Sequence, residues 1–149
     1  GNIPGTIGET SVVCLLVGAA YLLIRRVIKP VIPFTYIGTF AVLIMIYAVA
    51  SGRGFDLTFL AAHLCGGGLM LGAFFMATDY VTTPVTKTGK VIFGIGCGVI
   101  TCVIRFFGSY PEGVSFSILL MNILTPYIDM VTKSKPLGAI TKKKEAKSE

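Results

Sequence analysis

Long apolar runs, separated by short breaks of polar residues, proline and glycine, most strongly constrain what this chain can fold into. A bilayer requires roughly 20 consecutive apolar residues for each spanning helix. Such runs predict five spans, at about residues 9–28, 33–50, 56–77, 90–107 and 113–131. Hydrocarbon contains no water to satisfy peptide groups, so these segments are expected to be helical. Only 13% of the residues are charged, against about 25% in a soluble domain. The sequence therefore predicts an all-α, polytopic membrane protein.

The basic residues fall on one side of these predicted spans. Of the 13 Lys and Arg residues, five lie in the first and third connections and six in residues 133–149, which leaves only Arg53 and Arg105 elsewhere. The positive-inside rule then places both connections and the basic tail in the cytoplasm, and the N-terminal segment outside. Residues 1–132 form the predicted transmembrane region. A basic tail after a final span is typical of a topology and anionic-lipid signal rather than of nucleic-acid binding.

The third predicted span contains an unusual glycine cluster in the stretch HLCGGGLMLGAFFMATD, comprising Gly66, Gly67, Gly68 and Gly72. Each glycine in a helix interior costs about 1 kcal/mol relative to alanine. Glycines in membrane helices often permit close packing. Three in succession also fit a broken helix whose carbonyls face a cavity, and such oxygens are ligands for a hard cation such as Na⁺. Both interpretations remain open at this stage. In the fourth span, a GxxxG pattern at residues 94–98 predicts a close-packing face.

Several polar residues within or beside the spans have a structural and a functional interpretation. His63 is a functional candidate because it is ionisable inside a membrane, but a neutral histidine bonded to a backbone group is favoured. Arg105 is expected at the outer surface, paired with Glu112 or in a solvated loop. Asn122 is expected to need a partner within the membrane, and Asp129 lies on the same side as Asp79.

The start of the chain and the end of the third span offer further candidates. Thr6 and Glu9 match a capping box, and the same helix terminus could face a phosphate or a polar cofactor edge. Asp79 either forms a turn before Pro84 or attracts cations at a pore mouth. The four cysteines all lie in apolar runs without CxxC spacing, which argues against a disulfide framework and a zinc site. The pattern favours transport, with no complete catalytic site in the chain.

Three stretches, IPGTIGETS, GGGLMLGAFFMATDYVTTPVTKTGK and RFFGSYPEGVSFSILLMNILTPYID, closely resemble the C-terminal half of the D subunit of the Rnf complex. They resemble more loosely the B subunit of the Na⁺-translocating NADH:quinone reductase. The resemblance covers nearly the whole chain except the lysine tail. It implies half of a ten-helix fold similar to urea transporters, in the cytoplasmic membrane of a prokaryote. It also implies a translocase that couples electron transfer between ferredoxin and NAD⁺ to movement of Na⁺ or H⁺, with the other Rnf subunits and membrane lipid as partners.

The resemblance further implies flavin cofactors and an ion path. In the Rnf family this subunit carries FMN on the threonine of an S-G-A-T motif, and the quinone-reductase relative also binds riboflavin. No S-G-A-T occurs in these 149 residues, so the attachment site is expected upstream of Gly1. A possible lining of the flavin pocket is Gly8, Glu9, Thr10 and Ser11, and a possible Na⁺ path is Leu71, Phe75 and Asp79. Two other functions remain open, a urea-like channel without redox chemistry and a structural scaffold subunit.

Overall fold

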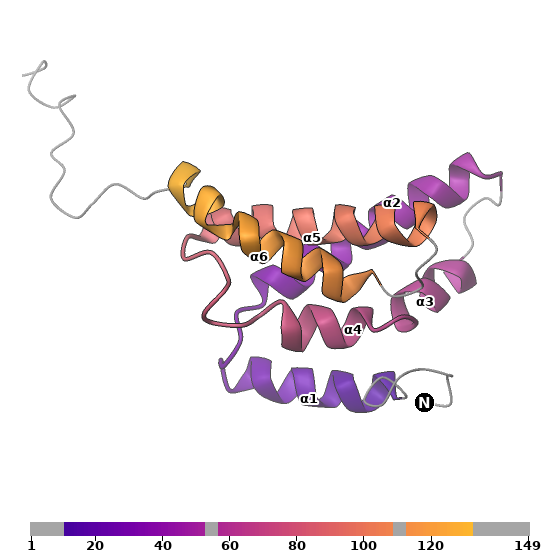
Figure 1. The fold of residues 1–149 in the computed structure, drawn as a ribbon. Coiled ribbons are helices and arrows are strands. Elements are labelled where there is room, and N and C mark those ends of the chain that lie inside the picture. Colours follow the sequence, from indigo (N-terminus) through magenta and orange to yellow (C-terminus); the bar gives the residue numbers. More distant parts are fainter. Residues whose placement is uncertain (1–10, 53–56, 109–112, 133–149) are drawn as a thin grey trace, which may run out of the picture.

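The computed structural model describes residues 11–52, 57–108 and 113–132, and every regular element among them is a helix (Figure 1). The all-α prediction is confirmed. In chain order the elements are α1 (Val12–Ile24), α2 (Val31–Ala50), α3 (Leu57–Cys65), α4 (Leu69–Leu71), the π-helix η1 (Gly72–Met76), α5 (Lys87–Phe107) and α6 (Val114–Val131).

Three of these helices, α2, α5 and α6, are long and apolar enough to cross a membrane. The third predicted span is divided between α3 and α4–η1, which are bent by 63° relative to one another, and counting this pair as one span gives four. The polytopic architecture is therefore confirmed within the described residues. The first predicted span differs, because α1 has only 13 residues.

The predicted continuation of the first span to residue 28 is wrong, because the backbone turns left-handed at Arg26, where φ is 54°. The N–H of Val27 bonds the carbonyl of Leu22 at 3.0 Å, and that of Arg26 bonds the carbonyl of Leu23 at 3.0 Å. This pair of bonds is a Schellman motif, which closes a helix at its C-terminus. Glycine usually occupies the left-handed position, so no residue type in this stretch signals that α1 ends there.

Close contact between α2 and α5 forms the centre of the molecule. A Cβ atom added at Gly98 would lie 2.8 Å from Cβ of Thr39 and 3.1 Å from the carbonyl oxygen of Tyr36, and one added at Gly94 would collide with Thr35. The two glycines of the GxxxG pattern therefore let the backbones of α2 and α5 approach closely, as predicted.

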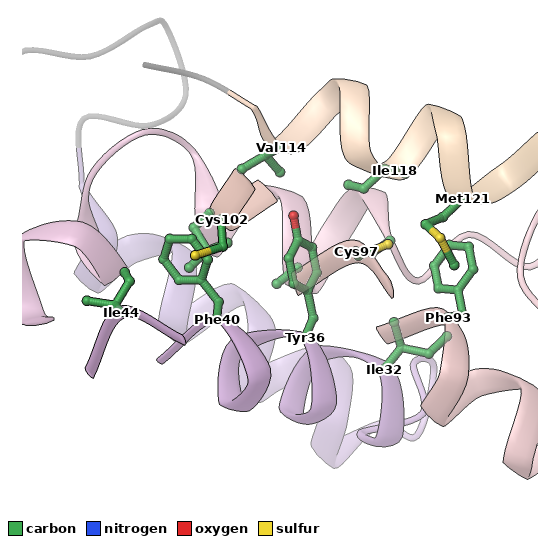
Figure 2. Close-up of a cluster of buried hydrophobic side chains, with 13 residues drawn as sticks. Ile32, Tyr36, Phe40, Ile44, Phe93, Cys97, Cys102, Val114, Ile118 and Met121 are labelled. Carbon is green, nitrogen blue, oxygen red and sulfur yellow. The ribbon is translucent and has the colours of Figure 1, made fainter. Parts of the chain in front are cut away.

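A buried group of three hydroxyls links α2, α5 and α6 within this core. The hydroxyl of Tyr36 lies 2.6 Å from Oγ1 of Thr101 and 3.1 Å from Oγ of Ser117, and Thr101 and Ser117 are 2.7 Å apart. All three residues are fully buried. Figure 2 shows the Tyr36 ring rising from α2 between Phe40 and Cys97. Interhelical hydrogen bonds of this kind help to fix helix packing in a membrane, where the hydrophobic effect between helices is weak.

We predict that Gly98→Ala destabilises the full-length protein by about 1–3 kcal/mol, the usual cost of overpacking a core. The neighbouring Thr39 is β-branched, and its Cβ cannot move away without its backbone. Gly38→Ala is the matched control, since a Cβ there meets nothing within 4 Å. Thermal unfolding of the detergent-solubilised protein compares the two, and equal midpoints would contradict the packing role of Gly98.

Candidate functional site: the break in the third predicted span

The glycine triplet interrupts the helix inside the third predicted span. The helix α3 ends at Cys65, and Gly67 and Gly68 then adopt positive φ angles of 63° and 66°. Glycine adopts such angles without the steric cost that a side chain imposes. The broken-helix interpretation is thus confirmed for the triplet. Gly72, the fourth glycine, instead permits close packing of helices, because a Cβ added there would collide with Val114 of α6.

Arg105 of α5 occupies the break. Its Nη1 donates to the carbonyl oxygen of His63 at 2.7 Å, and its Nη2 donates to those of Gly66 at 3.0 Å and Gly67 at 2.8 Å. The last carbonyls of a helix have no partner within the helix, and they carry the negative end of the helix dipole. The guanidinium therefore satisfies and neutralises the end of α3.

The surroundings of Arg105 are largely apolar. Its guanidinium carbon lies 4.9 Å from the ring centroid of Phe40 on α2, a geometry typical of a cation–π contact. Beside it is an open hollow of about 300 Å³, lined by Ala62, His63, Gly66, Gly67, Arg105 and Phe106. The expectation of a solvated Arg105 is wrong, because its side chain is turned into the break and half-buried there. Glu112, its other expected partner, lies outside the described residues.

His63 lies on the last turn of α3 as a structural residue. Its Nδ1 is 3.0 Å from the carbonyl oxygen of Phe59, one turn earlier. A carbonyl only accepts, so Nδ1 carries the proton in this contact. The imidazole also stacks on Phe106, with a centroid separation of 6.1 Å. The prediction of a histidine bonded to a backbone group is confirmed.

The predicted cation-path residues, Leu71, Phe75 and Asp79, follow the break on successive turns. Leu71 ends α4, and the ring of exposed Phe75 lies against α1, where a Cβ added at Gly18 would be 3.4 Å from its Cζ. Asp79 is exposed beyond η1. Among the residues it describes, the structure contains no group of three or more His, Cys, Asp or Glu side chains able to hold a metal.

Asp79 organises the turn that follows η1. Its Oδ1 accepts the N–H of Val81 at 3.4 Å and its Oδ2 accepts the hydroxyl of Thr82 at 3.4 Å, while Thr83 donates to its carbonyl oxygen at 2.8 Å. This is the turn chemistry expected of aspartate. The carboxylate remains accessible from outside, so the turn and a role in attracting cations are compatible.

Hydrogen bonds join the connection before α5 to the end of α6. Oδ1 of Asp129 accepts the N–H of Val85 at 3.1 Å, and Thr86 donates to Thr132 at 2.8 Å. A hollow of about 200 Å³ at this end is lined by residues that include Lys29 and Lys90. The first and third connections and the end of α6 therefore lie together, as the alternation of spans predicts.

The segment expected to line a flavin pocket is described only at its last residue. Gly8, Glu9 and Thr10 lie outside the described residues, as does the predicted cap Thr6. Ser11 caps α1, and its Oγ accepts the N–H of Cys14 at 3.4 Å.

Asn122 lacks the partner expected for it within the described residues. Its Oδ1 is buried and accepts no hydrogen bond from them. The helix α6 continues through Pro126. Proline has no N–H, so the backbone carbonyl of Asn122, four residues earlier, receives no helical hydrogen bond from it.

Comparison with known sequences identifies the family. Residues 1–138 match the profile of the NQR2, RnfD, RnfE family. The chain belongs to this family. It is 48% identical over 147 residues to the D subunit of the Na⁺-translocating ferredoxin:NAD⁺ oxidoreductase complex of Acetobacterium woodii, covering 99% of this chain and 43% of that protein.

Two further relatives in the NQR2, RnfD, RnfE family show the same pattern. The D subunit of the proton-translocating ferredoxin:NAD⁺ oxidoreductase complex of Clostridium ljungdahlii is 45% identical, covering 93% of this chain and 41% of the relative. The D subunit of the ion-translocating oxidoreductase complex of Stutzerimonas stutzeri is 42% identical, covering 93% and 38%. The chain thus spans about two fifths of the length of these relatives, and its predicted resemblance to this subunit of the Rnf complex is confirmed.

We predict that Gly67→Ala destabilises the full-length protein by about 1–2 kcal/mol, because a left-handed backbone crowds a Cβ atom. Gly67→Asn is the matched variant, since asparagine adopts this conformation more readily, and it should recover part of the loss. Thermal unfolding midpoints of both proteins test this. An alanine variant as stable as wild type would contradict the conformation assigned to the break.

Proposed function

We propose that this chain is part of a membrane subunit of a redox-driven ion pump, which couples electron transfer between ferredoxin and NAD⁺ to the movement of Na⁺ or H⁺. The observation that carries this proposal is the 48% identity, over nearly the whole chain, to a component of a complex named for that reaction. Other subunits of such a complex are the expected partners. The enzymatic activity belongs to the complex, and this chain supplies part of its membrane region.

The broken span supports a role in ion movement rather than a purely structural one. Irregular backbone at membrane depth is tolerated where it is buried in protein or lines a water-filled cavity, and transporters use broken helices to place carbonyls at their ion sites. The half α4–η1 leads from the break to the exposed carboxylate of Asp79. Asp79 is therefore the side chain we place at the mouth of the path.

The proposed orientation puts the N-terminal segment outside and the lysine-rich tail in the cytoplasm. The positive-inside rule requires basic residues of separate connections to share one side. Lys29 of the first connection and Lys90 of α5 line one hollow, which supports this arrangement. Asp79 then faces the cytoplasm, and the break lies towards the outer side.

FMN is expected in the longer protein, and riboflavin is a second candidate. Of the segment expected to line the flavin pocket, the structure describes only Ser11, whose hydroxyl caps α1. The covalent attachment is expected upstream of Gly1, and residues 8–11 remain the proposed lining of the pocket. The full-length coding sequence should contain S-G-A-T before Gly1, and in-gel flavin fluorescence of the full-length protein should depend on that threonine.

Asp79→Asn tests the ion path. In inverted vesicles carrying the complete complex, we expect the Na⁺ concentration for half-maximal ferredoxin:NAD⁺ activity to rise by up to about fivefold, since one exposed charge contributes up to about 1 kcal/mol. Asp129→Asn is the control, because its carboxylate lies at the same end and holds a backbone N–H. An unchanged Na⁺ response in Asp79→Asn would remove Asp79 from the path. If wild-type vesicles show no ferredoxin-driven ion uptake, the proposed function itself is wrong.

A further inference from the structure

Two lysines from separate parts of the chain converge on one hollow at an end of the helix bundle. Lys29 precedes α2 and Lys90 lies in the first turn of α5, and both line the hollow of about 200 Å³ described above. Their ammonium groups are close enough for the two charges to repel one another. Each ammonium donates hydrogen bonds and accepts none, so an anion placed between the two groups would offset their repulsion.

The first turn of α2 adds to the positive potential at this hollow. The helix has 20 residues and begins at Val31 without a side chain that caps its N-terminus, and Ile32 of that turn lines the hollow. The first N–H groups of a helix have no partner within it and carry the positive end of its dipole. Such N-termini favour phosphate groups. The two lysines and the helix therefore favour the same kind of ligand.

The two carboxylates described at this end of the molecule hold the chain around the hollow. Asp79 organises the turn after η1. The charge of Asp129 acts on Lys90, and its Oδ1 accepts the N–H of Val85. Neither carboxylate belongs to the lining, whose charged residues are Lys29 and Lys90. The lining itself is therefore positive.

Apolar side chains form much of the remaining wall, which favours a lipid over a free phosphate ion. Ile28, Ile32 and Pro84 belong to the lining. The hydroxyls of Thr78 and Thr83, also in the lining, donate to backbone carbonyls, so the ammonium groups are the charged donors. Basic pockets between membrane helices bind the headgroups of anionic lipids. A lipid offers both a phosphate for the lysines and carbon for the apolar wall.

We propose that this hollow binds the phosphate group of an anionic phospholipid, with Lys29 and Lys90 donating to its oxygens. The hollow lies where the candidate spans α2 and α5 begin, and α6 ends beside it, so it is at one surface of the membrane. The binding claim rests on this geometry. Its assignment to the cytoplasmic leaflet rests on the orientation in the proposed function.

Lipid binding to the full-length protein tests the proposal. The protein is stripped of native lipid in a non-ionic detergent and titrated with phosphatidylglycerol, and the bound lipid is counted by native mass spectrometry. We expect Lys29→Gln and Lys90→Gln each to weaken the tightest phosphatidylglycerol site by about fivefold, and the double variant to weaken it by about twentyfold, because each lysine near a membrane surface contributes separately.

Two controls separate this site from general attraction by positive charge. Lys87→Gln removes an exposed lysine from the same turn of α5 but outside the lining, and it should leave the affinity unchanged. The pair Lys142→Gln and Lys143→Gln removes as much charge from the basic tail as the double variant removes from the hollow, and it should also spare the tightest site. An equal loss of affinity in the tail pair would overturn the proposal.

Two further titrations separate the lipid from its phosphate alone. Phosphatidylcholine carries the same phosphate beside a compensating positive charge and should bind at least fivefold more weakly than phosphatidylglycerol. Millimolar inorganic phosphate lacks the apolar part and should not displace the lipid. Inorganic phosphate that binds these lysines as tightly as phosphatidylglycerol would reject the lipid, and so would an unchanged phosphatidylglycerol affinity in the double variant. Should the double variant not fold, the two single variants decide.

The lipid site and the proposed function fail separately. Lipid binding is measured in detergent without ferredoxin or NAD⁺, so a complex that does not pump ions leaves this result unaffected. Conversely, normal ferredoxin-driven uptake in wild type, together with an unchanged lipid affinity in the double variant, would uphold the proposed function and reject the lipid site.

Discussion

The hydrogen bonds from Arg105 to the end of α3 let a helix stop inside an apolar span. Each unsatisfied backbone group in hydrocarbon costs several kcal/mol, and ending α3 at Cys65 leaves carbonyls that no longer have a partner within the helix. Arg105 satisfies three of them from a helix about 40 residues further along the chain. The break and Arg105 therefore depend on each other. The glycines end the helix and leave carbonyls without helical partners, and the guanidinium donates hydrogen bonds to those carbonyls.

The position of Arg105 depends in turn on how α5 packs against α2. Gly98 and Arg105 are seven residues apart, nearly two full turns, so they share the face of α5 that meets α2. The close approach at Gly98 and the hydroxyls of Tyr36, Thr101 and Ser117 fix the register of these helices. The same register brings Phe40, one turn after Tyr36, beneath the guanidinium. Small residues in the core thus determine the chemistry at the break.

Local patterns predicted part of this structure, whereas contacts between distant residues could not be predicted from one sequence. Apolar runs indicated α2, α5 and α6, and the GxxxG pattern indicated a close-packing face on α5 but not that α2 is its partner. The triplet at Gly66 left packing and breakage equally open, because both use glycine. The end of α1 at Arg26 was missed, since a non-glycine residue takes the left-handed position of its Schellman motif. The partners of Arg105 are 38–42 residues away, and an arginine near the end of a span is ordinarily explained by reaching to the surface. The flavin-lining and cation-path residues remain predictions.

The two sides of the break differ in what they can offer an ion. The carbonyl oxygens of His63, Gly66 and Gly67 at the end of α3 already accept hydrogen bonds from Arg105. Beyond η1, the N–H of Ala77 bonds the carbonyl of Gly72 and the hydroxyl of Thr78 bonds that of Phe74, while the carboxylate of Asp79 remains exposed. The proposed cation route through this span therefore has its free oxygen ligands on the side of Asp79 rather than at the end of α3.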